Sequence, residues 1–262
     1  GDGMGSDWIL PVYGLIVGVL VGLTGMGGGV LMTPLLVLGL GMPAAAAVGT
    51  DLAYSTITKF VGGWQHWRQG TVDLRVVRAL AIGSVPATLV AVMTLFLLHD
   101  TETADIDALL ERLIGVMLIV AASLMVYRMV RGGYAGAEHA SLYTNFPTRR
   151  LVAIGALGGF LVGLTSIGSG SLIIALLVMT VALAPDKLVG TDVAHAFLLV
   201  GAAALAHMFL LRDVDVALAG KLLLGSIPGV LIGSRMAGWV PKRPLQGILA
   251  ILLLSSAYSL LR

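Results

Sequence analysis

Cysteine is absent from this chain of 262 residues, and charged residues are scarce. The lack of cysteine excludes disulfides, thiol nucleophiles and cysteine-ligated metal sites. Only 11% of the residues are charged, against about 25% in a typical soluble domain, whereas 58% are hydrophobic. This composition excludes a water-soluble globule and predicts an all-α, polytopic membrane protein.

Three further absences narrow the function. The net charge of +2 is small and scattered, which excludes a nucleic-acid-binding surface. No Gly-x-x-x-x-Gly-Lys-Ser/Thr motif occurs, so the sequence gives no support for ATP-driven transport by this chain alone. Residues 1–7 lack a basic n-region, and we treat them as a flexible or vector-derived N-terminus rather than a signal peptide. We expect no catalytic residues, no metal ligands and no cofactor.

An internal duplication organises the rest of the chain. Residues 21–29 (VGLTGMGGG) align with 162–170 (VGLTSIGSG), and 48–51 (VGTD) align with 189–192 (VGTD). Slightly later, 83–86 (GSVP) align with 225–228 (GSIP). A shared membrane composition explains matching Leu and Val but not these patterns. The sequence therefore predicts a first transmembrane repeat over 1–131, a cytoplasmic linker over 132–150 and a second repeat over 151–262.

Each repeat is expected to hold a glycine-interrupted pair of short helices followed by three longer helices. The apolar runs are 8–23, 30–41, 44–68, 75–98 and 109–130 in the first repeat, and 151–165, 171–184, 187–211, 217–239 and 244–261 in the second. A helical span needs about 20 residues. The short runs therefore either cross tilted or fold back as a re-entrant pair, and the total is eight to ten spans.

The distribution of Lys and Arg predicts the orientation in the membrane. Loop 99–111 is acidic and is expected outside, whereas three regions are basic and are expected to be cytoplasmic, with Arg68, Arg75, Arg78, Arg128, Arg131, Arg149, Arg150, Arg235, Lys242 and Arg243. Each repeat then crosses an odd number of times, so the repeats are inverted and both termini lie outside. Trp8, Trp64, Trp67 and Trp239 fall near span ends and fit an interfacial aromatic belt.

The glycine-rich breaks in both repeats are the candidate substrate site. A broken helix leaves backbone N–H groups free, and the N-terminus of the following half-helix carries partial positive charge. Together these features suit a small oxyanion near the midplane. The alternative is that the glycines only permit tight helix packing. The substrate-binding candidates are Thr24, Gly25, Met26, Gly27, Gly28, Thr50, Thr165, Ser166, Gly168, Ser169, Ser171 and Thr191.

The paired segments GLTGMGGG and GLTSIGSG, the Val-Gly-Thr segments and the Gly-Ser-x-Pro pairs resemble the sulfite exporter (TauE/SafE) family of membrane permeases. The resemblance covers about residues 8–261. It implies two related halves and transport of sulfur-containing anions such as sulfite and organosulfonates, often as efflux. It also implies that the two breaks, with Gly49-Thr50 and Gly190-Thr191, contribute to the pocket.

Ionisable residues inside spans are candidates for coupling or gating. Asp51 and Asp192 are matched in the repeats, and each either carries a proton or cation or is a structural hydrogen-bond acceptor. Lys59 either attracts the anion and pairs with a carboxylate, or snorkels to the cytoplasmic interface, which the sequence slightly favours. His195 lies three residues after Asp192 and either shares its proton or is a packing residue.

The sequence thus predicts a secondary transporter, expected to be an exporter, in the bacterial inner membrane. Its partners are a small anion, a coupling proton or cation, and membrane lipid, and the oligomeric state is open. A passive anion channel, or an importer of another small anion, is the alternative. An intramembrane hydrolase with Ser169 or Ser171 as nucleophile and His195 or His207 as base has little support, because no feature orients the base.

Overall fold

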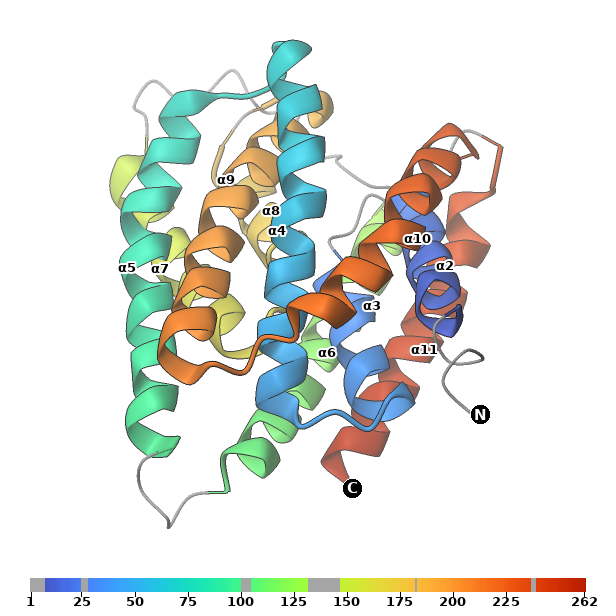
Figure 1. Ribbon diagram of the computed structural model, residues 1–262. Helices are drawn as coiled ribbons and strands as arrows, with labels where there is room; N and C mark the ends of the chain where they lie inside the picture. Colours follow the sequence, from blue (N-terminus) through green and yellow to red (C-terminus); the bar gives the residue numbers. More distant parts are fainter. Residues whose placement is uncertain (1–7, 25–27, 100–104, 132–146, 182, 237–238) are drawn as a thin grey trace.

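The computed structural model describes residues 8–24, 28–99, 105–131, 147–181, 183–236 and 239–262. The described residues form helices and connecting loops (Figure 1). The elements of the first repeat are α2 (Ile9–Thr24), α3 (Gly29–Pro34), η1 (Leu35–Gly39), α4 (Ala44–Arg68), α5 (Leu74–His99) and α6 (Ile106–Arg131). Those of the second are α7 (Thr148–Thr165), α8 (Leu172–Val178), α9 (Pro185–Ala206), η3 (His207–Leu211), α10 (Val216–Met236) and α11 (Lys242–Leu261). The all-α fold class is confirmed.

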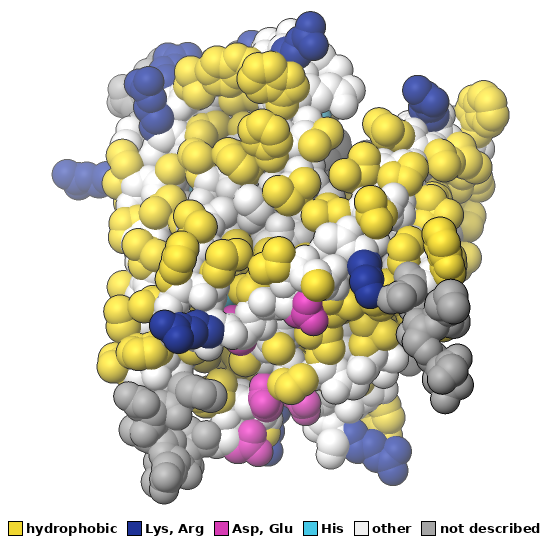
Figure 2. All heavy atoms as spheres, in the orientation of Figure 1, with side chains coloured by type: hydrophobic (Ala, Val, Ile, Leu, Met, Phe, Trp, Pro, Cys, Tyr) yellow, Lys and Arg dark blue, Asp and Glu magenta, His cyan; other side chains and the backbone are white. Residues whose placement is uncertain are grey.

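Six helices in the described ranges are long and apolar enough to cross a membrane, namely α5, α6, α7, α9 with η3, α10 and α11. Helix α4 has 25 residues but carries Asp51 and Lys59 and lies against α9. Three of the four helices in the interrupted pairs are short, as predicted: α2 has 16 residues, α3 has 6 and α8 has 7, whereas α7, with 18 residues, is longer than predicted. Large apolar side chains cover much of the outer surface, as expected for lipid contact (Figure 2).

The first helix of each repeat packs on the helix that the fourth apolar run of the other repeat forms. Helix α2 lies along α10 and α7 lies along α5 (Figure 1). Glycines four residues apart make these approaches possible: Gly14 and Gly18 of α2 meet the α10 backbone, and Gly155 and Gly159 of α7 meet the α5 backbone. An added Cβ at any of them would overlap main-chain atoms, so small residues fix these two contacts, as is usual for helices in lipid.

The two repeats contact each other reciprocally. Helix α4 packs on α9 and α6 packs on α11, and each pair consists of matched elements from the two repeats. Helices α4 and α9 run in opposite directions (Figure 1), with Gly63 facing Ala194 at one contact and Gly201 facing Thr56 at the next. The middle of this antiparallel crossing lies between the two contacts, and it is where the polar core of the protein begins.

Candidate functional site

The break in the second repeat is a buried, irregular loop. Helix α7 ends at Thr165, and Ser166 follows it with a left-handed φ of 59° while its N–H donates to the Val162 carbonyl at 2.7 Å. The Thr165 hydroxyl donates to the Leu161 carbonyl at 2.7 Å and accepts from the Ile167 N–H at 3.2 Å. Gly168 has a φ of 118°, a conformation that only glycine adopts without strain.

Hydroxyl groups line this loop and are buried in the protein. Ser169 and Ser171 are 3% and 5% exposed, so their side chains face the interior rather than lipid. In the first repeat, Gly25, Met26 and Gly27 lie outside the described residues, and so does the side chain of Thr24, the last residue of α2. The break resumes at Gly28, just before α3.

The two breaks meet in the interior of the protein. A Cβ placed on Gly29, the first residue of α3, would overlap the backbone of Ser166 in the second break and lie 3.2 Å from Oδ2 of Asp51. A Cβ on Gly28 would lie 2.9 Å from the ring of Tyr54. Glycine is therefore needed here for close approach of two backbones and a carboxylate. The two predicted breaks are therefore in contact at Gly29 and Ser166.

Asp51 is fully buried beside the meeting point and is well supplied with donors. The Thr33 hydroxyl donates to Oδ2 at 2.5 Å, and the Ser55 hydroxyl donates to Oδ1 at 3.1 Å. The Ser166 hydroxyl also lies close to this carboxylate, although it makes no hydrogen bond of normal geometry. Asp51 therefore links α3, α4 and the second break.

Asp192, the repeat mate of Asp51, has a different environment. It is 1% exposed, and its Oδ1 has no hydrogen-bond partner among the described residues. The positions that match Thr33 and Ser55 are Ile174 and Ala196, which offer no hydroxyl. A buried carboxylate oxygen without a donor is costly, which marks this position for a proton or a ligand.

His195 lies one turn after Asp192 on α9 and is fully buried. Its Nε2 is 2.8 Å from the Ser84 hydroxyl of α5, and its Nδ1 has no partner in the described part of the chain. No hydrogen bond joins His195 to Asp192 among these residues, so the predicted proton sharing would need a bridging water or a side-chain movement.

Lys59 lies in the middle of the α4–α9 crossing. Its side chain is buried, and the charges of Asp192 and Asp51 favour its protonated form without contacting it directly, because no hydrogen bond or ion pair holds the ammonium within the described ranges. The snorkelling interpretation is therefore wrong, because Lys59 faces α9 rather than the interface. Since Gly63 faces Ala194, Asp51 and Asp192 lie on opposite sides of Lys59 along the crossing.

The central polar cluster thus consists of Lys59, the two aspartates, His195 and Ser166. It joins both repeats, both breaks and the α4–α9 crossing, and it contains buried polar atoms that have no hydrogen-bond partner among the residues that the structure describes. The profile of the sulfite exporter TauE/SafE family matches residues 10–260, almost the whole chain. The chain belongs to this family.

Relatives in the TauE/SafE family carry transporter names. The chain is 43% identical to the probable membrane transporter protein YjnA of Bacillus subtilis over 95% of this chain and 98% of YjnA. It is 28% identical to the probable membrane transporter protein YdhB of the same organism, over 87% of this chain and 89% of YdhB. No solved structure matches the chain. This member of the family is a multi-pass membrane transporter.

Thr50 and Thr191, the family's expected pocket residues, lie away from the central polar cluster. The Thr50 hydroxyl accepts from the Asp215 N–H at 3.0 Å, and the Thr191 hydroxyl accepts from the Asp73 N–H at 2.9 Å. Thr50 therefore holds the loop before α10, and Thr191 holds the loop before α5, so each threonine binds the opposite repeat. We call these two contacts the cross-repeat latches.

A histidine accompanies each cross-repeat latch. His66 Nδ1 is 2.9 Å from the Thr71 hydroxyl, and His207 Nδ1 is 3.1 Å from the Asp213 carboxylate. A glycine lies against each of these pairs. A Cβ at Gly190 would be 2.6 Å from Thr71, and a Cβ at Gly49 would be 2.6 Å from Asp213. His66 and His207 occupy matching positions in the two repeats, but the sequence alone does not connect them with the threonines.

Ser84 and Ser226 are functional candidates that sequence reasoning undervalued. Ser84 contacts His195, and Ser226 makes a short hydrogen bond with the Tyr54 hydroxyl. Both serines come from the repeated Gly-Ser-x-Pro pattern, and Tyr54 and His195 are repeat mates. The repeated pattern was the available signal, and its partner residues became visible only in the fold.

The predicted nucleophile and base pairs are not assembled. No hydrogen bond joins Ser169 or Ser171 to a histidine within the described ranges, because His195 contacts Ser84 and His207 contacts Asp213 and the Gly163 carbonyl. The same ranges contain no group of three His, Asp or Glu side chains that could hold a metal ion.

Proposed function

We propose that the protein is a secondary transporter of the bacterial inner membrane that moves a small oxyanion, such as sulfite or an organosulfonate, by alternating access. The family name suggests export and a sulfur-containing substrate. The observation that carries the proposal is a buried lysine that has no hydrogen bond or ion pair with another described residue, at the junction of two interrupted repeats. Buried ionisable groups inside a membrane are costly and are kept where they serve transport.

Lys59 supplies the positive charge that an anion needs in this environment. The nearby Ser166 hydroxyl and His195 Nδ1 have no hydrogen-bond partners among the described residues and would supply neutral donors to anion oxygens. Charge-assisted hydrogen bonds to an oxyanion are stronger than neutral ones. In this scheme Ser169, Ser171 and Gly168 shape the wall of the site, and Gly28 allows close approach on the other side.

Charge balance in the central polar cluster favours coupling to protons. Lys59 and Arg128 act on Asp192 and offset the charges of the two aspartates, so a bound monoanion would give the cluster an excess negative charge. Placing uncompensated charge in a low-dielectric interior is costly. Anion binding is therefore expected to bring a proton to Asp192, whose Oδ1 has no donor, more readily than to Asp51, which accepts two hydroxyl donors.

The reciprocal contacts support an inverted repeat with a gate at each end. Matched helices run antiparallel, and each cross-repeat latch ties one repeat to the loop of the other near an opposite end of the α4–α9 pair. Opening one latch while the other stays closed would expose the central polar cluster to one side at a time. Under the basic-loop assignment the Thr191–Asp73 latch faces the cytoplasm and both termini lie outside.

Flux in proteoliposomes tests this proposal. We expect radiolabelled sulfite to accumulate inside the vesicles against its own gradient when the external solution is made more acidic than the lumen. Asp192→Asn should abolish this pH-driven accumulation and keep sulfite–sulfite exchange, because exchange needs no net proton movement. Asp186→Asn, an exposed carboxylate at the start of α9, is the matched control and should resemble the wild type.

Two outcomes would contradict the proposal. A pH gradient that only changes the rate of downhill flux would indicate a passive channel. Equal pH-driven accumulation by wild type and Asp192→Asn would remove the aspartate from coupling.

A further inference from the structure

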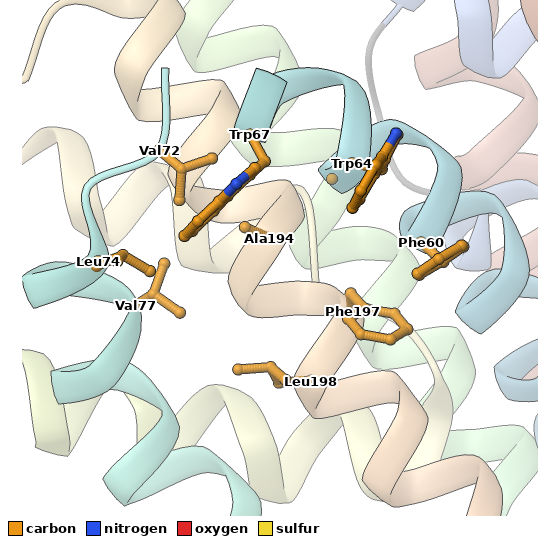
Figure 3. A pocket seen from close by; sticks show the side chains of 10 residues that line it. Phe60, Trp64, Trp67, Val72, Leu74, Val77, Ala194, Phe197 and Leu198 are labelled. Atoms are coloured by element: carbon orange, nitrogen blue, oxygen red, sulfur yellow. The ribbon is translucent and has the colours of Figure 1, made fainter. Parts of the chain in front are cut away.

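A groove on the lipid-facing surface lies between α4, α5 and α9 (Figure 3). Its volume is about 250 Å³, and its lining is apolar. Phe60 and Trp64 stand on one side and Leu74 and Val77 on the other, with Trp67 at one end. We call this feature the aromatic groove.

Small residues at the α4–α9 contact create the floor of the aromatic groove. Gly63 faces Ala194, and a Cβ at Gly63 would lie 3.6 Å from the Ala194 Cα, so the helices touch here without side chains to fill the space above them. The Phe60 and Phe197 rings close the far end, with their centroids 5.4 Å apart. The hollow is therefore a property of the closely packed helix pair and is open toward the surrounding lipid.

Positive charge lies at the end of the aromatic groove that Trp67 marks. Arg68 follows Trp67 and shares a helix face with Trp64, and Arg78 shares a face with Leu74 one turn before it. Both arginines are exposed. Lys and Arg side chains gather at this end of the molecule, around the end of α4 and the start of α5 (Figure 2). Arg75 contacts Asp73 at 3.8 Å and is therefore already engaged.

We propose that the aromatic groove binds one acyl chain of an anionic phospholipid whose phosphate lies against Arg68 and Arg78. The apolar lining matches the chain, the tryptophans lie at the level of the headgroup, and the arginines complement its charge. The basic loop is expected on the cytoplasmic side, where anionic lipids are read by clusters of Lys and Arg. The lipid would hold α5 against the α4–α9 pair next to the Thr191–Asp73 latch.

Quenching of tryptophan fluorescence by brominated lipids tests the proposal directly. The chain has four tryptophans, so a background with Trp8→Phe and Trp239→Phe leaves only the two of the aromatic groove as reporters. The protein is reconstituted in phosphatidylcholine vesicles with increasing mole fractions of brominated phosphatidylglycerol or brominated phosphatidylcholine. We expect brominated phosphatidylglycerol to reach half-maximal quenching at a lower mole fraction than brominated phosphatidylcholine.

Charge variants separate a headgroup site from general attraction to anionic membranes. Arg68→Gln or Arg78→Gln should raise the mole fraction of phosphatidylglycerol that is needed by about fivefold each. The control is Arg235→Gln with Arg243→Gln, which removes two exposed arginines at the same end of the molecule but away from the aromatic groove and should change nothing.

Three results would overturn the inference. The first is equal quenching by the two brominated lipids. The second is a control pair that shifts the quenching curve as much as Arg68→Gln or Arg78→Gln does. The third is the absence of quenching by either lipid, which would indicate that protein, such as a second copy of this chain, covers the aromatic groove. A retained elution profile in size-exclusion chromatography shows that each variant is folded.

Discussion

Replacing Lys59 with methionine is the perturbation that tests the central polar cluster most directly. Methionine is unbranched and nearly fills the volume of the lysine stem, so the α4–α9 contact should survive while the charge is lost. Lys59 is 7% exposed, and no ion pair holds its ammonium in the described part of the chain. Removing the ammonium of Lys59 therefore changes the charge of the site without breaking an ion pair.

The size of the effect follows from Coulomb's law. An anion held about 5 Å from the ammonium at an effective dielectric constant of about 20 gains about 3 kcal/mol. Loss of this attraction should raise the dissociation constant on the order of a hundredfold. Lys59→Arg keeps the charge and should retain binding within about tenfold, because the geometry changes but the attraction remains.

Isothermal titration of sulfite into the detergent-solubilised protein measures this difference. Lys187→Gln removes an exposed lysine at the start of α9 and is the matched control, expected to bind like the wild type. A folded Lys59→Met variant that binds sulfite within twofold of the wild type would refute the assignment of Lys59 as the anion's counter-charge.

Three further predictions address backbone strain, a latch and topology. Gly168→Ala should destabilise the protein by about 1–2 kcal/mol because of its φ of 118°, whereas Gly247→Ala, with nothing within 4 Å, should be neutral or slightly stabilising in thermal unfolding. Thr50→Val should remove the hydrogen bond to the Asp215 N–H, cost about 1 kcal/mol and increase the accessibility of single cysteines near the central polar cluster to thiol reagents from one side of the membrane. Single cysteines at Gln69 and Arg262 should be labelled from opposite sides of the membrane, with Arg262 outside, and labelling from the same side would contradict the inverted topology.

Much of the helical framework could be predicted from the sequence. The apolar run 44–68 matches α4 at both ends, and the run 8–23 matches α2 within one residue, because continuous hydropathy and flanking loops define where a helix can lie in lipid. The run 171–184 was too long for α8, which ends at Val178, because the chain turns at Met179 and Thr180 despite being apolar. Met179 is 77% exposed, so this is an apolar turn at the surface, which hydropathy cannot distinguish from a helix.

Helix pairing and side-chain direction could not be predicted in the same way. The four-residue spacing of Gly14 and Gly18 signals a close helix contact, but it does not identify α10 as the partner. Thr50 and Asp51 are neighbours in sequence, yet one reaches the loop of the opposite repeat and the other reaches the break, because adjacent residues on a helix point about 100° apart. The burial of Lys59 likewise depends on which face α9 covers.

The proposed function assigns the coupling chemistry to positions where the two repeats differ. The duplicated frame supplies two matched aspartates, two breaks and two cross-repeat latches, and a perfectly symmetric cluster would treat both sides of the membrane alike. In this chain Lys59 has Val200 as its mate, and His195 has Tyr54. In the proposed mechanism, a movement of the Lys59 charge toward one aspartate would favour protonation of the other. Under the proposed function, the asymmetric pairs would link proton binding to the side that is open.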